Sequence, residues 1–177
     1  MVQKLKIFWI ILCLLMISQF GFASQVDNKM TIAVLDFKNN TSRIRYDRLQ
    51  RTIAELLKTE LSRCPDIAVV ERTKLESILT EYALAQAGYI EKKYAQEVGR
   101  LAGAEYIITG EINQAAGRLR IDSHLIKVQT GQILGEKVTG SDVEKIEAMI
   151  NLLAQNLIFD LTGRGEKIEY KKLHNYH

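Results

Sequence analysis

A strand–helix–strand pattern near the start of the chain is the feature that most restricts its fold. The run Met30–Phe37 is apolar and rich in β-branched residues, which favours a buried strand. Apolar residues then recur at helical spacing between Leu49 and Leu61, and Pro65 ends that predicted helix. A second short strand is predicted at Ile67–Val70. A strand, a helix and a strand in this order predict a right-handed crossover between two parallel strands.

Two more helices are predicted after this crossover. Thr73 and Glu76 fit a capping box, which predicts a helix that starts here and ends near Gly88. Another helix is predicted over Lys92–Ala102, with Gly103 as the residue that ends it.

The pattern changes in the second half of the chain. Residues 104–112 form a predicted third strand, and residues 119–128 alternate between apolar and polar side chains with a turn segment on either side. Together with Ile133–Val138, this alternation predicts an antiparallel meander. A final amphipathic helix follows and ends at Gly163.

The order of these elements predicts an α/β fold in a single layered domain over residues 27–163. Its mixed sheet begins with parallel strands, ends with the antiparallel meander and is packed by helices. Hydrophobic residues make up 47% of the chain and charged residues 25%, which is the composition of a globular protein rather than a disordered one. Residues 164–177 are polar and predict a flexible tail.

The first 23 residues fit a secretory signal peptide. Two lysines precede the apolar run Ile7–Ile17, and Gly21 and Ala23 supply small residues before a cleavage position. A retained anchor is the alternative, but a membrane span needs about 20 apolar residues and Ser18 interrupts the run. Cys13 lacks the small residues that precede a lipidated cysteine. We therefore expect export to the periplasm, free or at the inner face of the outer membrane, with no transmembrane segment after cleavage.

The charge balance argues against a nucleic-acid partner. The chain has 24 Lys and Arg against 21 Asp and Glu, a formal net charge of +3, and two of the lysines belong to the predicted signal peptide. The remainder is close to neutral, whereas nucleic-acid-binding domains usually carry a strongly basic face.

Cysteine and histidine do not form a recognisable metal site. Without Cys13 in the mature protein, Cys64 has no partner for an internal disulfide, so we expect it to be either buried and inert or paired between chains. His174 and His177 stand three residues apart in the tail, which is a spacing that metal ligands share. No cysteine or carboxylate cluster accompanies them, so we predict no metal and no cofactor.

Asp36 and Glu71 are the strongest candidates for chemistry. Each follows one of the two predicted parallel strands, and open α/β sheets bind ligands at that edge. Two carboxylates can act as a general acid and a general base. A structural role is the favoured alternative: Asp36 would cap the next loop, and Glu71 would pair with Arg72 or the neighbouring helix. No nucleophile accompanies them and His124 falls within a predicted strand, so we predict no catalytic residues and no enzyme.

Four segments of the chain together resemble the curli production assembly/transport component (CsgG-type) family. In chain order they are MTIAVLDFKNNT, IAVVERTKLESILTEYALAQAG, VGRLAGAEYIITGEI and LRIDSHLIKVQTGQIL. The resemblance spans residues 30–161. The lipoprotein activators of penicillin-binding proteins and the amino-terminal domain of TolB are similar to the same layout more loosely.

The resemblance implies a lipid-anchored subunit of a secretion channel, in which each copy contributes two hairpins to a transmembrane barrel. One hairpin would lie where this chain has Asn113–Arg118, and the other where it has Val138–Asp142. Each barrel strand needs about 9–11 residues, so both segments are too short to supply a hairpin. The lipidation cysteine is missing as well. We therefore expect a soluble variant of the family without the transmembrane hairpins.

These observations favour a protein that works by binding other proteins. We expect an exported accessory protein for assembly or secretion, in the biogenesis of curli-type or other surface structures, with envelope proteins and copies of itself as partners. The alternatives are a regulator of a cell-wall synthase and, less favoured, a small hydrolase that uses Asp36 and Glu71. Contact is expected through the loops Lys38–Ser42 and Tyr89–Lys93 or through a free strand edge.

Overall fold

The computed structural model describes residues 29–81, 92–141 and 143–168 of the 177-residue chain. The predicted signal peptide, Cys13, both tail histidines and the predicted helix end near Gly88 lie outside these residues. The elements, in chain order, are β1 (Met30–Val34), β2 (Lys38–Asn39), η1 (Ile44–Tyr46), α2 (Asp47–Ser62), β3 (Ile67–Val69), α3 (Arg72–Glu81), α4 (Lys92–Ala102), β4 (Tyr106–Ala115), β5 (Arg118–Lys127), β6 (Ile133–Gly140), η3 (Val143–Lys145) and α5 (Ile146–Thr162).

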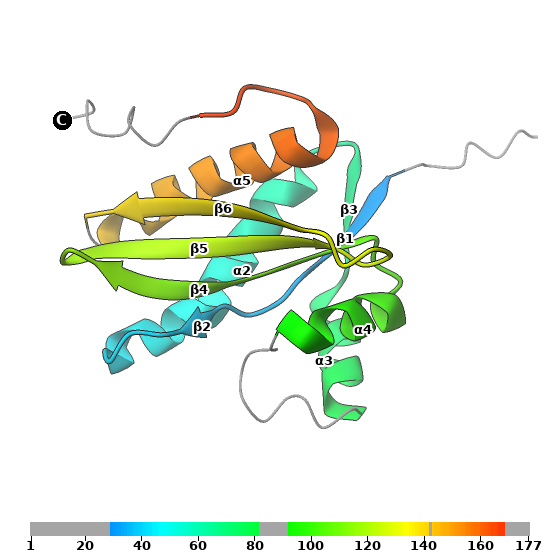
Figure 1. Cartoon of the computed structure of the whole chain (residues 1–177), viewed down its shortest axis with the longest axis horizontal. Coiled ribbons are helices and arrows are strands. Elements are labelled where there is room, and N and C mark those ends of the chain that lie inside the picture. The colour runs from blue at the N-terminus through cyan, green and yellow to red at the C-terminus, as the bar shows by residue number, and fades with distance from the viewer. Residues whose placement is uncertain (1–28, 82–91, 142, 169–177) are drawn as a thin grey trace, which may run out of the picture.

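The strands form one mixed sheet (Figure 1). Their order is β3-β1-β4-β5-β6, and the short β2 pairs with the distal part of β4. β1 lies between β3 and β4 and runs parallel to both, whereas β4, β5 and β6 are antiparallel to one another. The predicted parallel crossover and the predicted meander are therefore both confirmed, and β4 is the strand that joins them.

The first strand is shorter than the sequence predicts. β1 ends at Val34, and the backbone N–H of Phe37 donates to the carbonyl of Gln50 on α2 instead of to the sheet, at 3.1 Å. The ring of Phe37 fills the space over Gly110, where an added Cβ would lie 2.4 Å from its Cε1 atom. Phe37 is thus buried as a core residue rather than as a strand residue, and the two roles look alike in sequence. The predicted loop after it contains β2.

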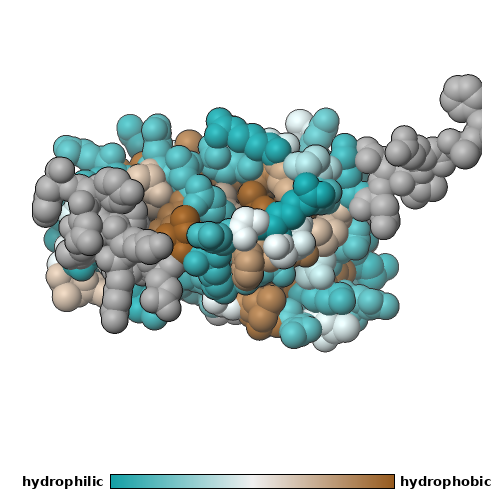
Figure 2. Space-filling view, turned by 90° about the horizontal axis from the view of Figure 1, so that it is seen from above, coloured by the Kyte–Doolittle hydropathy of each residue, from teal (hydrophilic) through white to brown (hydrophobic). Residues whose placement is uncertain are grey.

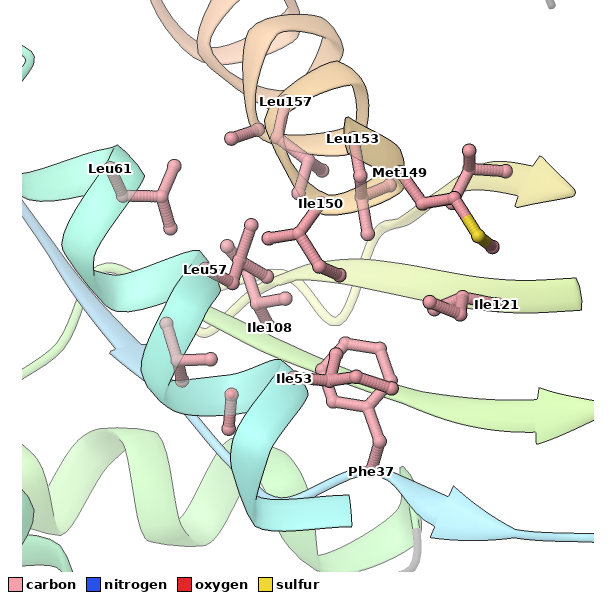
Figure 3. Packing of buried hydrophobic residues seen from close by; sticks show 14 of the residues in the cluster. Phe37, Ile53, Leu57, Leu61, Ile108, Ile121, Met149, Ile150, Leu153 and Leu157 are labelled. Carbon is pink, nitrogen blue, oxygen red and sulfur yellow. The ribbon is translucent and has the colours of Figure 1, made fainter. Parts of the chain in front are cut away.

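Helices α2 and α5 cover one face of the sheet and enclose the larger core (Figure 1). The apolar side of α2 and the inner side of α5 meet each other and the sheet, as their sequence periodicity requires. Figure 3 shows the buried residues between the two helices and the strands, among them Phe37, Ile53, Leu57, Leu61, Ile108, Ile121, Met149, Ile150, Leu153 and Leu157.

Helices α3 and α4 cover the opposite face, at the end of the sheet where the parallel strands lie (Figure 1). They enclose a smaller core built mainly of alanine, valine, leucine and isoleucine. Gly99 lets α4 approach the sheet closely, because an added Cβ there would lie 2.5 Å from Cγ2 of Val128. Beyond α4, this face of β4, β5 and β6 carries polar side chains, and we call it the open sheet face.

The ends of α4 and α5 follow the sequence, but the predicted start of α3 does not. α3 begins at Arg72, with the N–H of Leu75 donating to the carbonyl of Glu71 at 3.3 Å, so Thr73 lies inside the first turn. The capping box predicted at Thr73 is therefore wrong. Gly103 and Gly163 follow α4 and α5 with φ of +68° and +69°, which is the left-handed conformation expected of glycine after a helix.

Residues 164–168, where we expected a flexible tail to begin, are tied to the domain, and we call them the C-terminal strap. The backbone N–H of Ile168 donates to Oδ1 of Asn156 at 2.9 Å, and Nδ2 of Asn156 donates to the Ile168 carbonyl at 3.2 Å. Lys167 pairs with Asp160 and with Glu136 of β6. Figure 2 views the molecule from the side on which α5 lies in Figure 1, and this surface is mostly hydrophilic with small, separate hydrophobic patches.

Candidate functional site

The ends of β1 and β3 bring Asp36 against Arg72. Asp36 follows β1, and Arg72 opens α3 directly after β3. Because the two strands are parallel neighbours, their carboxyl ends lie at the same edge of the sheet. Nη1 and Nη2 of Arg72 donate to the two carboxylate oxygens of Asp36 at 2.8 and 3.0 Å. Such a paired geometry fixes both side chains more firmly than a single ion pair does.

Two further carboxylates complete the arginine cluster, which consists of Asp36, Glu55, Arg72 and Glu76. Nε of Arg72 donates to Glu76 at 2.7 Å and Nη1 donates to Glu55 at 3.3 Å. The hydrogen bond with Asp36 is the main cause that raises the pKa of Arg72, so the guanidinium stays charged at every accessible pH. Asp36 binds Arg72 in place of the predicted capping of the next loop, and the sequence analysis had paired Arg72 with Glu71 instead.

A groove of about 430 Å³ lies beside the arginine cluster, between α2 and the β3–α3 connection. We call it the strand-end groove. It is lined by Glu55, Lys58, Thr59, Ser62, Val69, Val70, Glu71, Arg72 and Thr73. Both strand-end carboxylate positions of the sequence analysis are therefore in one region, with Glu71 exposed at the groove and Asp36 behind Arg72.

The groove residues do not assemble a nucleophile with a base. The hydroxyl of Thr59 donates to the carbonyl of Glu55 at 3.0 Å, and that of Ser62 donates to the carbonyl of Thr59 at 2.8 Å. Both hydroxyls thus donate to backbone carbonyls of α2, whereas a nucleophilic hydroxyl would donate to a general base. The groove thus offers mixed polar and apolar contacts to a partner, and three of its charged side chains, Glu55, Lys58 and Arg72, are already engaged in ion pairs.

His124 lies on β5, as the sequence predicts, and points to the open sheet face. Its Nε2 atom lies 3.0 Å from a carboxylate oxygen of Glu111 on the neighbouring strand β4. Beside this pair, Asp122 accepts hydrogen bonds from Arg120 and from Asn113. Burial raises the pKa of Asp122, but the hydrogen bonds from Arg120 and Asn113 outweigh it and hold the pKa below its ordinary value.

The open sheet face is the functional candidate that sequence reasoning missed. Lys38, Glu111, Asp122 and Lys137 are neighbours in register across β2, β4, β5 and β6. The alternation along residues 119–128 was a signal that one face of this strand is polar. The cross-strand row itself was not visible, because it depends on the register of four strands.

Cys64 is buried, 7% exposed, and unpaired at the end of α2. This fits the first of the two roles expected for it. In the described parts of the chain no three histidine, cysteine, aspartate or glutamate side chains converge as metal ligands. Of the described helices, none has both the length and the apolar content needed to cross a bilayer.

A comparison with protein families matches residues 16–119 to the family described as curli production assembly/transport component CsgG. This match covers more than half of the chain. The chain belongs to the CsgG family. The expected resemblance is confirmed on three of its four segments, since the fourth begins at Leu119 and lies almost entirely beyond the match. A comparison with curated proteins gave no match.

Solved structures share the fold of this CsgG-family chain. The LpoB C-terminal domain from Salmonella enterica superposes with a TM-score of 0.52 at 19% identity, over 71% of this chain and 92% of that one. The LpoB C-terminal domain from Escherichia coli gives 0.51 at 21% identity, over 72% and 93%. TolB from Acinetobacter baumannii gives 0.52 at 21% identity, over 77% of this chain and 29% of that one. The predicted single α/β domain with a mixed sheet is therefore confirmed.

Proposed function

We propose that this chain is a cell-envelope accessory protein that supports the assembly or secretion of a surface structure by binding other proteins. Membership of the CsgG family, whose description is production, assembly and transport of curli, is the observation that carries the proposal. In this proposal the chain is exported and works in the periplasm or at the inner face of the outer membrane.

The chemistry of the described residues supports a binding role over a catalytic one. Of the two strand-end carboxylates, Asp36 is engaged by Arg72, and His124 is engaged by Glu111. A hydrolase that uses Asp36 and Glu71 as general acid and general base would need both carboxylates to be free to exchange a proton with substrate. Asp36 is instead held by two hydrogen bonds from a permanently charged group.

In-cell crosslinking tests the proposal. A photoreactive amino acid is placed at exposed positions of the full chain in the organism that produces it, and crosslinked partners are identified by mass spectrometry. We expect subunits or export components of a surface structure, and we expect deletion of the protein to reduce that structure on the cell. Recovery of a peptidoglycan polymerase alone, with the surface structure intact, would contradict the proposal and favour the regulator of a cell-wall synthase.

A further inference from the structure

Strand β6 presents an unpaired backbone edge. It is the last strand of the sheet, and among the described residues its ladder partner is β5. The N–H of Lys127 donates to the carbonyl of Gln132, which makes that pair a hydrogen-bonded one, and such pairs alternate along an antiparallel ladder. The backbone groups of residues 134, 136 and 138 therefore point to β5. Those of Ile133, Gly135, Lys137 and Thr139 point away from the sheet.

The first half of this edge is open to solvent and partly apolar. Ile133 and Leu134 are 49% and 44% exposed, which is unusual for large hydrophobic side chains of this protein. A Cβ added to Gly135 would meet no atom within 4 Å, so a larger side chain from a neighbouring strand has room there. Apolar side chains and unpaired backbone groups together are what an added strand would cover.

The charges along β6 argue against a second copy as the added strand. If two copies of β6 paired antiparallel about a two-fold axis over nearly the whole strand, the axis would pass through Glu136 or Lys137. The residue on the axis would then lie directly opposite the same residue of the second copy. Like charges directly opposite each other destabilise a strand pair.

Lys137 favours an acidic residue on the added strand. It is exposed on the open sheet face, next in register to Asp122, whose carboxylate is taken by Arg120 and Asn113. The formal charges of Arg120, Asp122 and Lys137 add up to one positive charge. A carboxylate directly opposite Lys137 would neutralise it.

We propose that β6 binds an extended segment of another protein as one more strand of the sheet. The segment places an acidic side chain opposite Lys137 and a large side chain over Gly135, two residues apart and therefore on the same face. This inference rests on the proposed binding function and names the chemistry of the partner. The other sheet edge, β3, has three residues and offers fewer outward backbone groups.

A peptide probe tests the proposal on the mature protein. The probe is a blocked heptapeptide with the order threonine, valine, glutamate, valine, tyrosine, valine, threonine, which places glutamate opposite Lys137 and tyrosine over Gly135 when it runs antiparallel to β6, and the control peptide carries lysine in place of glutamate. We expect the glutamate peptide to shift the NMR amide signals of Gly135, Lys137 and Thr139 and to slow their hydrogen exchange. The amides of residues 134, 136 and 138 should keep their exchange rates, because they already donate to β5.

Two variants and one control sharpen the result. Lys137→Glu should lower the affinity for the glutamate peptide about fivefold and raise the affinity for the lysine peptide by a similar factor, because the cross-strand charge pair changes sign. Lys137→Pro removes an outward N–H that β5 does not use, and should abolish binding. Lys74→Glu makes the same charge change on the exposed surface of α3 and should alter neither affinity. Circular dichroism checks the fold, and if the proline variant unfolds, the charge swap decides alone.

Absence of peptide binding, protection of other amides, or an affinity indifferent to Lys137→Glu would overturn the proposal. The in-cell experiment separates it from the broader function when the photoreactive residue stands at the exposed Ile133 of β6 and, in a parallel strain, at Lys74. Crosslinks to a surface-structure component from Lys74 but not from Ile133 would remove the β6 site and leave the accessory function standing. The proposed function itself fails if no exposed position crosslinks such a component.

Discussion

The side chain of Arg72 alone joins three parts of the chain. Its guanidinium binds Asp36 from the end of β1, Glu55 from α2 and Glu76 from the next turn of α3. Arg72 and Asp36 are each about one-fifth exposed, so water screens the attraction in part. The cluster holds the start of α3 against the sheet at the edge where the strand-end groove opens.

Replacing Arg72 with methionine should lower the free energy of unfolding by about 1–3 kcal/mol, because two partly buried carboxylates lose charged hydrogen bonds. Urea unfolding followed by circular dichroism measures the change. Arg63→Met is the matched control, because Arg63 is an exposed arginine that pairs with Glu60 on the same helix. That control should cost no more than about 0.5 kcal/mol. Equal losses in the two variants would show that the cluster adds nothing beyond a surface ion pair.

The Asp122 carboxylate should make stability depend on pH in acid. Its pKa in the folded state lies below the ordinary value of 3.8, so its stabilising effect is present above that pH and is lost as the pH falls through the lowered pKa. Asp122→Asn should therefore destabilise the protein at pH 7 and approach the wild-type stability as the pH falls through the lowered pKa. Urea unfolding across this range measures the difference. Arg120→Gln should flatten the same pH dependence, and a pH-independent gap between wild type and Asp122→Asn would refute the assignment.

At the scale of the elements, α4 shows how one small residue sets the distance between a helix and the sheet. The position of Gly99 is filled by Val128 and Ile107 from the sheet. Backbone and side chains come this close because glycine has no Cβ. The smaller core below α4 depends on that distance, since Val98 and Ala102 of the helix are both buried in it.

Gly99→Val should push α4 away from the sheet and cost about 1–3 kcal/mol of stability, the usual cost of overpacking a core. Thermal unfolding and the near-ultraviolet circular dichroism spectrum record the loss. Gly135→Ala provides the comparison, because the space around that glycine is empty and the change should be close to neutral. Combining Gly99→Ala with Val128→Ala should cost less than the sum of the two single changes. An additive outcome would mean that the two residues do not compete for space.

Local sequence patterns predicted these elements well where one rule acts alone. The spacing of leucines gave α2, and the glycines after α4 and α5 gave their ends. The patterns failed where a side chain far along the chain decides the local structure. Phe37 leaves the strand because Gly110 makes room for its ring, and Asp36 meets Arg72 because β1 and β3 are neighbours. Neither contact has a signature within ten residues.

On the scale of the whole molecule, the sheet has one face that is fully covered and one that is covered at a single end. α2 and α5 shield the first face along its length, and α3 with α4 leaves the open sheet face on β4, β5 and β6 (Figure 1). The C-terminal strap then closes over α5 through Asn156, a buried polar residue that is 6% exposed. The β6 edge that we propose for partner binding borders this open sheet face.

Removal of the C-terminal strap should destabilise the domain because the buried Asn156 side chain loses both of its hydrogen bonds to Ile168. A chain that ends at Gly163 should be less stable than one that ends at Ile168 by about 1–3 kcal/mol, the cost of a buried polar group without partners. Thermal and urea unfolding of the two truncated chains give the difference directly. Asn156→Leu in the shorter chain should recover part of the loss. Equal stability of the two chains would show that the strap does not contribute to the fold.

The position of β1 in the middle of the sheet sets the order in which the chain can fold. Its residues come first among the described strands, yet one of its neighbours arrives late: the N–H of Thr31 donates to Glu105, 74 residues further on. Closing such a distant contact is slow compared with forming the hairpins of the meander. A nascent chain therefore cannot complete the pairing of its central strand until β4 has emerged.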